Sequence, residues 1–257
     1  MAGIVACRGE IRCDRGRLVA CQSSGGRINV VFGASDSVAP SQVKRLVELV
    51  RETDSLRRFP RRYIGSRPIT ISLIARERQG IEAAAYGEER TIVLPLEAAL
   101  AWRTEDLRSL LRHELTHIAL AGGRTSFQLP KWFQEGFAEW TAGGLTCQGA
   151  ARIRVNMLLR PEFLKDTSMF KEPAFAASRV GYDVFSTFFE FLEERSTGVN
   201  LSLLDSLDAY GLENGIRRAT RADLPTLQRE WRIYAMRRYS DLREQQACQS
   251  RPIPSTR

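Results

Sequence analysis

The sequence predicts an α+β fold, with a small mixed sheet and helices in the N-terminal part, then a helix that carries two histidines, and then a mostly helical C-terminal lobe. Two observations support this prediction. Short apolar runs of β-branched residues occur before residue 95, and apolar residues at spacings of three and four dominate from residue 104 onward. The chain has 257 residues, of which 43% are hydrophobic, so it can bury a substantial core.

The sheet is expected in the N-terminal part of the chain. Residues 1–26 are polar and charged and end in a Ser-Ser-Gly-Gly sequence, which is typical of a flexible tail. Ile28–Phe32 is then a short β-branched run, and apolar residues at helical spacing follow over Val43–Val50. Ile69–Ile74 alternates apolar and hydroxyl residues, and Thr91–Leu94 is a further β-rich run. We expect these strands to share one sheet.

Two helices are expected in the middle of the chain. Thr104 is suited to cap the first helix, acidic residues follow in its first turn, and its apolar stripe continues until Gly122. The second helix is signalled by Pro130, a favourable first-turn residue, and extends to Gly143. The segment that carries the histidines therefore lies on one long helix.

The rest of the chain is predicted to be mostly helical, and Val184–Leu192 and Leu224–Tyr239 are the clearest segments. The sequence contains no internal repeat and no low-complexity stretch. We therefore expect one folded domain over residues 27–240, followed by a C-terminal tail over residues 241–257.

The charge pattern bears on the partners of the chain. A net charge of +8 and a pI near 9.6 would suit an acidic partner such as nucleic acid. Nearly all of this charge is arginine, however, and the arginines are scattered except for one cluster at Arg57–Arg62. We therefore expect no nucleic-acid partner. We also expect no transmembrane segment, because charged residues interrupt every apolar run before it reaches about 18 residues.

The cysteines match no C-x-x-C metal or redox pattern. There are five of them: Cys7, Cys13, Cys21, Cys147 and Cys248. An odd number leaves at least one thiol unpaired, whereas a disulfide between Cys147 and Cys248, or one within the first 21 residues, stays open.

The N-terminus lacks the apolar segment of about 7–15 residues that is typical of a secretory signal. The sequence as given therefore indicates a cytoplasmic protein. Ile4–Cys7 and Leu18–Cys21 each resemble the end of a bacterial lipoprotein signal, so a true start upstream of Met1 would make the protein extracytoplasmic or lipid-anchored. The compartment and the oligomeric state are both left open.

The strongest functional signal is an H-E-x-x-H segment, which begins at His113 and ends at His117. Residues four apart lie on one face of a helix, roughly 6 Å from each other, so both imidazoles can reach one metal ion. Glu114 is turned part of the way around the helix, where it can contact a metal-bound water without being a ligand. Zinc lowers the pKa of bound water to about 7, and a nearby carboxylate can then accept its proton. The segment predicts a zinc site with Glu114 as general base.

Chance is the competing explanation for so short a pattern, but these two histidines are the only ones in the chain. A catalytic zinc site has three protein ligands and one open position, and no cysteine or further histidine is suitably placed. Glu135 follows His117 by 18 positions on the next predicted helix and is the favoured third ligand. Glu139 lies one helical turn further and is expected to accept a hydrogen bond from a histidine N–H. An ordinary solvated or ion-paired role for Glu139 stays open.

The segments His113–His117 and Leu129–Trp140, the latter reading L-P-K-W-F-Q-E-G-F-A-E-W, together resemble the gluzincin metallopeptidases, in particular the bacterial peptidase MA-like domain family. The resemblance covers residues 28–238 approximately and implies a zincin-like fold, one Zn²⁺ ion and a peptide or protein substrate. In that family the glutamate before the glycine of the second motif is the third zinc ligand, which corresponds to Glu135.

Two features of better-known relatives are missing. The sequence has no Gly-x-Met-x-Asn segment like the one that holds the substrate amine in gluzincin aminopeptidases, so aminopeptidase activity is not implied. No histidine follows His117 to stabilise an oxyanion as in thermolysin-like relatives. Gly181–Ser186 resembles the helix that follows the motif in the MA-like family, which makes Tyr182 the candidate oxyanion donor, with Arg179 behind it. A half-buried core position for Tyr182 stays open.

The favoured function is that of an endopeptidase which binds its substrate as an extra strand along the sheet edge, near Thr91–Leu94. The alternative is a non-catalytic protein of zincin fold that acts in assembly at the cell envelope. The intact Glu114 argues against that alternative, because a purely structural site does not require it. A basic nucleic-acid binder is the third and least favoured interpretation.

Overall fold

The computed structural model describes residues 68–74, 83–95, 104–122, 129–160, 162–164 and 167–240. For residues 6–7, 9–10, 13–14, 18–23 and 26–32 it describes the backbone alone. The chain divides into two compact units, Met1–Phe127 and Gln128–Arg257, and each is described by itself. In the described part of the chain, no helix is both long enough and apolar enough to cross a bilayer.

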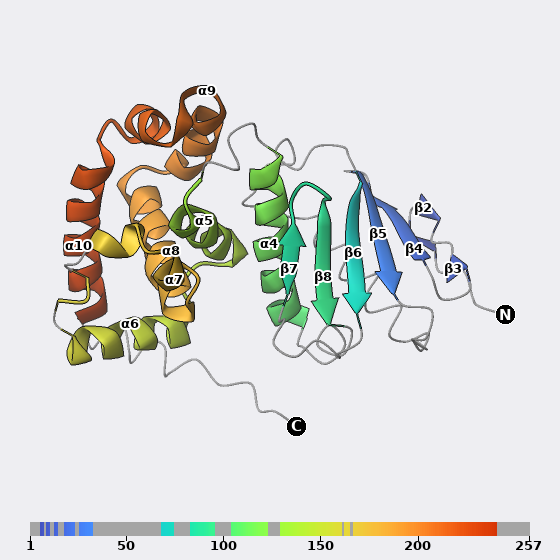
Figure 1. Cartoon of the computed structure of the whole chain (residues 1–257), viewed down its shortest axis with the longest axis horizontal. Coiled ribbons are helices and arrows are strands. Elements are labelled where there is room, and N and C mark those ends of the chain that lie inside the picture. Colours follow the sequence, from blue (N-terminus) through green and yellow to red (C-terminus); the bar gives the residue numbers. More distant parts are fainter. Residues whose placement is uncertain are drawn as a thin grey trace. The chain divides into compact units, whose positions relative to one another are not determined.

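The first unit is built around a mixed sheet. Strands β6 (Ile69–Ile74), β8 (Thr91–Pro95) and β7 (Ala84–Tyr86) lie side by side in that order (Figure 1). β6 and β8 are parallel, and β7 is antiparallel to β8. Burial alternates along β6 and β8 as expected for strands with one face in a core. The sequence-based prediction of a small mixed sheet in this part of the chain is confirmed.

The backbone ladder continues beyond β6. β5 (Gly26–Phe32) is parallel to β6, β4 (Leu18–Ser23) is antiparallel to β5, and β3 (Cys13–Asp14) is antiparallel to β4. β1 (Ala6–Cys7) and β2 (Gly9–Glu10) form a separate antiparallel pair. The domain boundaries at residues 26 and 240 stay predictions, and the helix predicted over residues 43–50 lies outside the described residues.

The edge of the sheet differs from our expectation. We predicted the edge near Thr91–Leu94, but β8 is hydrogen-bonded to β6 on one side and to β7 on the other. Among the strands that are described, β7 is the terminal one at this end of the sheet. The sequence did not reveal β7 because its three residues, Ala84, Ala85 and Tyr86, include no β-branched side chain and are too few to show alternation.

Helix α4 (Thr104–Ala121) carries the histidines. Its apolar stripe packs inward, and the side chains of Leu107, Leu111 and Ile118 are fully buried. Glu105 and Asp106 place negative charge in the first turn, where it interacts favourably with the helix dipole. The helix predicted from residue 104 is therefore present, with one buried face and one face available for a site.

The turn between β7 and β8 lies against the C-terminal end of α4. A Cβ atom added to Gly87 would lie 2.1 Å from the Cβ of Ala121 and 3.7 Å from the carbonyl oxygen of His117. Real Cβ atoms essentially never approach another atom within 3.0 Å, so this contact requires a glycine. The edge hairpin is thus packed directly against the turn of α4 that bears His117.

The second unit is mostly helical, as predicted. Its helices are α5 (Lys131–Ala142), α6 (Cys147–Leu159), α7 (Pro173–Ala176), α8 (Arg179–Arg195), α9 (Val199–Thr220) and α10 (Leu224–Ser240), with the 3₁₀ turn η2 (Thr167–Phe170) between α6 and α7. α9 is kinked at Gly211, which has a φ of 71°. Cys147 is disulfide-bonded, and its partner is outside the residues whose side chains are described.

An aromatic core holds α5 against α8. Trp132 of α5 packs edge-on against Phe188 of α8 at 5.6 Å between ring centroids and against Phe170 at 5.0 Å. A Cβ atom on Gly136 would lie 2.6 Å from the Cβ of Phe185, so the two helices approach closely at this glycine. Because Glu135 is the neighbour of Gly136, this contact fixes the position of the Glu135 backbone within the second unit.

Candidate metal centre

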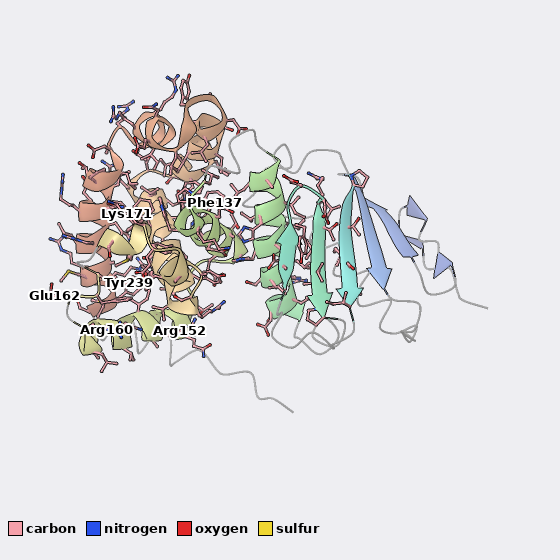
Figure 2. The ribbon with its side chains drawn as sticks, viewed as in Figure 1. Phe137, Arg152, Arg160, Glu162, Lys171 and Tyr239 are labelled. Carbon is pink, nitrogen blue, oxygen red and sulfur yellow. The ribbon has the colours of Figure 1, made fainter. Side chains whose placement is uncertain are left out.

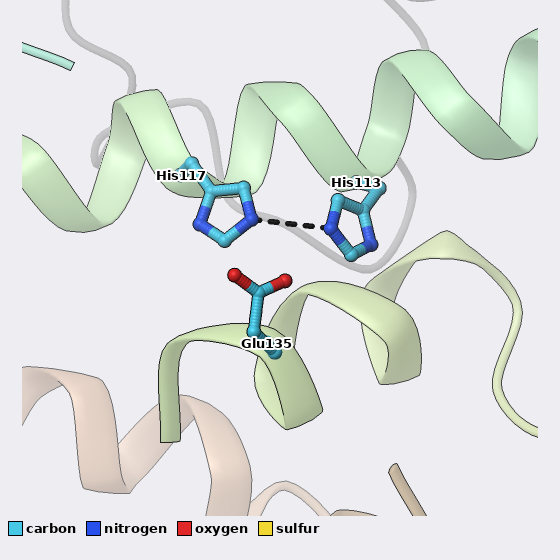
Figure 3. Close-up of side chains that lie close together, drawn as sticks. All are labelled: His113, His117 and Glu135. Carbon is cyan, nitrogen blue, oxygen red and sulfur yellow. Dashed lines mark hydrogen bonds between the residues drawn. The ribbon is translucent and has the colours of Figure 1, made fainter. Parts of the chain in front are cut away.

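The two histidines lie one helical turn apart on α4, and their imidazole rings face each other. The Nε2 atoms of His113 and His117 are 3.1 Å apart, and the ring centroids are 4.9 Å apart at an interplanar angle of 70° (Figure 3). The local cause is the helix itself, because side chains at positions i and i+4 project from the same face. The prediction that both imidazoles can reach one ion therefore agrees with this geometry.

Glu135 supplies an acidic group to the same cluster. One ligand atom each from His113, His117 and Glu135 can be chosen so that all three lie within 4.8 Å of one another. Figure 3 shows the Glu135 carboxylate turned toward the two rings. The residue is only 2% exposed, and its carboxylate forms an ion pair with Lys131, one turn earlier on α5. A buried carboxylate beside two imidazoles is a possible metal site.

The donor set and its spacing fit a divalent ion. Two ligand atoms bound to a tetrahedral zinc at about 2.05 Å and about 109° are roughly 3.3 Å apart. The 3.1 Å separation of the two Nε2 atoms is close to that value. Neutral imidazole and carboxylate also bind other first-row metals, so the donor set defines a metal site without selecting the metal.

Glu114 is buried, with 6% of its surface exposed, and follows His113 directly on α4. Successive residues of a helix are turned by about 100°, so its side chain leaves the helix in a different direction from either imidazole. Its role as general base stays a prediction. The neighbouring Thr116 hydroxyl donates to the carbonyl of Arg112 at 2.7 Å, which occupies that hydroxyl within the helix.

Glu139 lies one turn after Glu135 on α5 and has a side chain that is 12% exposed. It forms an ion pair with Arg179, the first residue of α8, at 3.5 Å. A hydrogen bond from a histidine to Glu139 stays a prediction. Tyr182 is half-buried on the same first turns of α8, and its role as an oxyanion donor likewise stays a prediction.

Several residues that shape the centre were not identified from the sequence. Lys131, which pairs with Glu135, stands at the i, i+4 spacing at which helical ion pairs form, so this signal was available. No signal in the sequence could have identified Gly136, because its importance depends on the close approach of α8, which is distant in sequence. The pairing of Arg152 with the buried Asp183 was also missed for that reason.

Comparison with models of known protein families finds no match to this chain, and comparison with curated proteins finds none either. The assignment of function therefore depends on the residues of the centre and on the sequence motifs that contain them.

Proposed function

We propose that this chain is a zinc-dependent metallopeptidase of the gluzincin type, with its catalytic domain over residues 27–240. The observation that carries the proposal is the cluster of His113, His117 and Glu135, whose ligand atoms lie within 4.8 Å of one another. Two imidazoles from an H-E-x-x-H helix and a glutamate from a following helix are the ligand set of a hydrolytic zinc site with one open position.

Each residue of the centre has a defined task in this proposal. His113, His117 and Glu135 would hold the ion through two nitrogen atoms and one oxygen atom. A bound zinc ion supplies Lewis-acid chemistry, which makes water acidic enough to act as a nucleophile near neutral pH. Glu114 accepts the proton of the attacking water at its carboxylate and delivers it to the leaving amine.

The surrounding residues would orient the reacting groups. Glu139 accepts an N–H from one of the histidines, which fixes the ring so that Nε2 faces the metal. The ion pair between Glu139 and Arg179 supports this role, because it restrains the carboxylate from one side. The Tyr182 hydroxyl, with Arg179 behind it, donates to the oxyanion that develops on the substrate carbonyl.

The substrate would be a peptide bound in extended form, and the enzyme would be an endopeptidase. β7 supports this part of the proposal, because it is terminal among the described strands of the sheet and its hairpin turn packs against the His117 turn of α4 through Gly87. A peptide added to the outer side of β7 would gain main-chain hydrogen bonds and would run beside the helix that bears Glu114.

Metal analysis of the purified protein, paired with a peptide-cleavage assay, tests the proposal. We expect one zinc per chain in the wild type, loss of zinc in His113→Ala and Glu135→Ala, and retention of zinc without cleavage of a mixed peptide pool in Glu114→Gln. Glu105→Gln is the matched control, since Glu105 is an exposed glutamate in the first turn of the same helix. A wild type without bound zinc would refute the metal site. Full cleavage by Glu114→Gln would refute the assigned base, and a zinc-loaded wild type that cleaves nothing would favour the non-catalytic alternative.

A further inference from the structure

Helix α6 carries a ridge of apolar side chains that the second unit leaves exposed. Val155 is 51% exposed, and Leu158 and Leu159 are each 75% exposed. These positions are three and four residues apart, so they lie on one side of the helix, while Gly149 and Ile153 are buried on the other side. Single exposed apolar residues are common on protein surfaces, but two adjacent leucines with a third apolar residue one turn away form a continuous patch.

The charges along this helix have one sign. α6 and its C-cap contain Arg152, Arg154 and Arg160 and no carboxylate. Figure 2 shows Arg152 and Arg160 along α6. Arg152 is paired with the buried Asp183, whereas Arg160 is exposed at the end of the apolar ridge. The ridge therefore ends in a solvent-facing guanidinium group.

The C-terminal end of α10 adds a second basic element beside α6. The Nε atom of Arg154 donates to the carbonyl oxygen of Tyr239 at 3.0 Å, which joins the two helices. Met236 and Arg237 are exposed within one turn of Tyr239, and Ile233 is exposed one turn earlier.

The charge on these two elements accounts for most of the excess positive charge of the protein. Between them, α10, α6 and Arg160 hold seven arginines and one glutamate, in a chain with a net charge of +8. That glutamate, Glu230, is paired with Arg195 at 3.3 Å, and Glu162 is the one carboxylate close to Arg160 in sequence. Seven of the 34 arginines of the chain thus lie on α6, its C-cap and α10, and two of these, Arg152 and Arg238, are paired with the α8 carboxylates of Asp183 and Glu194.

We propose that α6, with the adjoining end of α10, binds the surface of an anionic lipid membrane. Val155, Leu158 and Leu159 enter the boundary between headgroups and acyl chains, and Arg160 and Arg237 pair with lipid phosphates. Apolar residues on one face with arginines beside them are the features of a helix that lies in a membrane interface, and guanidinium groups bind phosphate through parallel hydrogen bonds. A symmetric pairing with a second copy would instead bring arginine against arginine, which charge repulsion opposes.

Flotation of the full-length chain with lipid vesicles tests this inference. One set of vesicles contains phosphatidylcholine alone, and the other contains roughly a third phosphatidylglycerol. We expect the wild type to float with the anionic vesicles alone, and to float less as salt shortens the screening length from about 10 Å at 0.1 M to about 3 Å at 1 M. Leu158→Ser/Leu159→Ser should lower the partition coefficient at least about tenfold, because two leucines no longer leave water. Arg160→Glu should lower it about fivefold or more.

The control is Tyr210→Ser, which removes an exposed aromatic residue from α9, a helix outside the proposed surface, and should leave flotation unchanged; Tyr210 is 46% exposed, close to the 51% of Val155. Circular dichroism confirms that each variant keeps its helices, and the leucines and Arg160 are exposed, so their replacement should not unfold the protein. Absence of wild-type flotation, or equal flotation of the leucine variant, would overturn the membrane assignment. If vesicle binding is absent, self-association that depends on the leucines would identify a second copy of the chain as the partner instead. Binding of a soluble polyanion without any contribution from the leucines would identify a soluble acidic partner instead.

Discussion

Replacing Gly87 by alanine tests the contact between the edge hairpin and the histidine helix. The added Cβ would lie 2.1 Å from the Cβ of Ala121, about 1.3 Å short of the 3.4 Å at which ordinary contact begins. Both atoms belong to short side chains that cannot rotate away, so the backbone of the hairpin or of α4 must move. Overpacking of this kind costs about 1–3 kcal/mol, whereas the lower chain entropy of alanine in the unfolded state returns only about 0.4–1 kcal/mol. We therefore expect Gly87→Ala to destabilise the protein.

A double-mutant cycle shows whether the steric reasoning is correct. Ala121→Gly removes the opposing methyl group and by itself should cost up to about 1 kcal/mol, because glycine is a poor helix former. In Gly87→Ala/Ala121→Gly the clash disappears, so the double variant should be about as stable as Ala121→Gly alone. Urea unfolding followed by circular dichroism measures all four proteins. A neutral Gly87→Ala variant, or two single effects that simply add, would refute the proposed contact.

Two further predictions concern the second unit. Arg152→Ala should destabilise the protein by about 3–5 kcal/mol, because it leaves the buried carboxylate of Asp183 without its charged partner. The Asp183 side chain is 1% exposed, and the Arg152 guanidinium donates to it at 2.6 and 3.0 Å. Urea unfolding measures the cost, and a stability loss smaller than that of an ordinary surface substitution would contradict the prediction. Burial raises the pKa of the Glu190 carboxyl above its usual 4.5, against the opposing effects of the Leu145 N–H and the Tyr239 hydroxyl. The folded state therefore holds this proton more tightly than the unfolded state, and the resulting stabilisation is complete below pH 4.5 and is lost as pH rises through the folded pKa. Glu190→Gln remains neutral at every pH, so the stability of the wild type relative to this variant should fall as pH rises above 4.5. A stability difference that does not change with pH would contradict the raised pKa of the Glu190 carboxyl.

The sequence predicted the elements that depend on local periodicity. The α+β class, the strands that became β6 and β8, and the helix from residue 104 follow from alternation and helical spacing, which act within one element. The alignment of His113 and His117 also belongs to this group, because the geometry of one helix places them together whatever surrounds it.

Other features were missed or were placed wrongly because they depend on residues distant in sequence. The sheet edge was assigned to the strand now called β8, since nothing in the sequence showed that the short β7 would add beside it. The roles of Gly87 and Gly136 became visible only through the atoms that lie opposite them. The roles of Glu114, Glu139 and Tyr182, and the family resemblance itself, remain predictions for the experiments above.

The order of residues along the chain is enough to show the chemical groups that it can offer: two imidazoles on one helical face, a glutamate between them, and a second acidic motif downstream. Helix packing could not be inferred in this way, because a helix fixes the directions of its own side chains but not the position of another helix. Within the second unit, the contact of Gly136 with Phe185 holds α5 against α8, and the hydrogen bond from Arg154 to Tyr239 joins α6 to α10. Both contacts connect segments that sequence spacing does not relate.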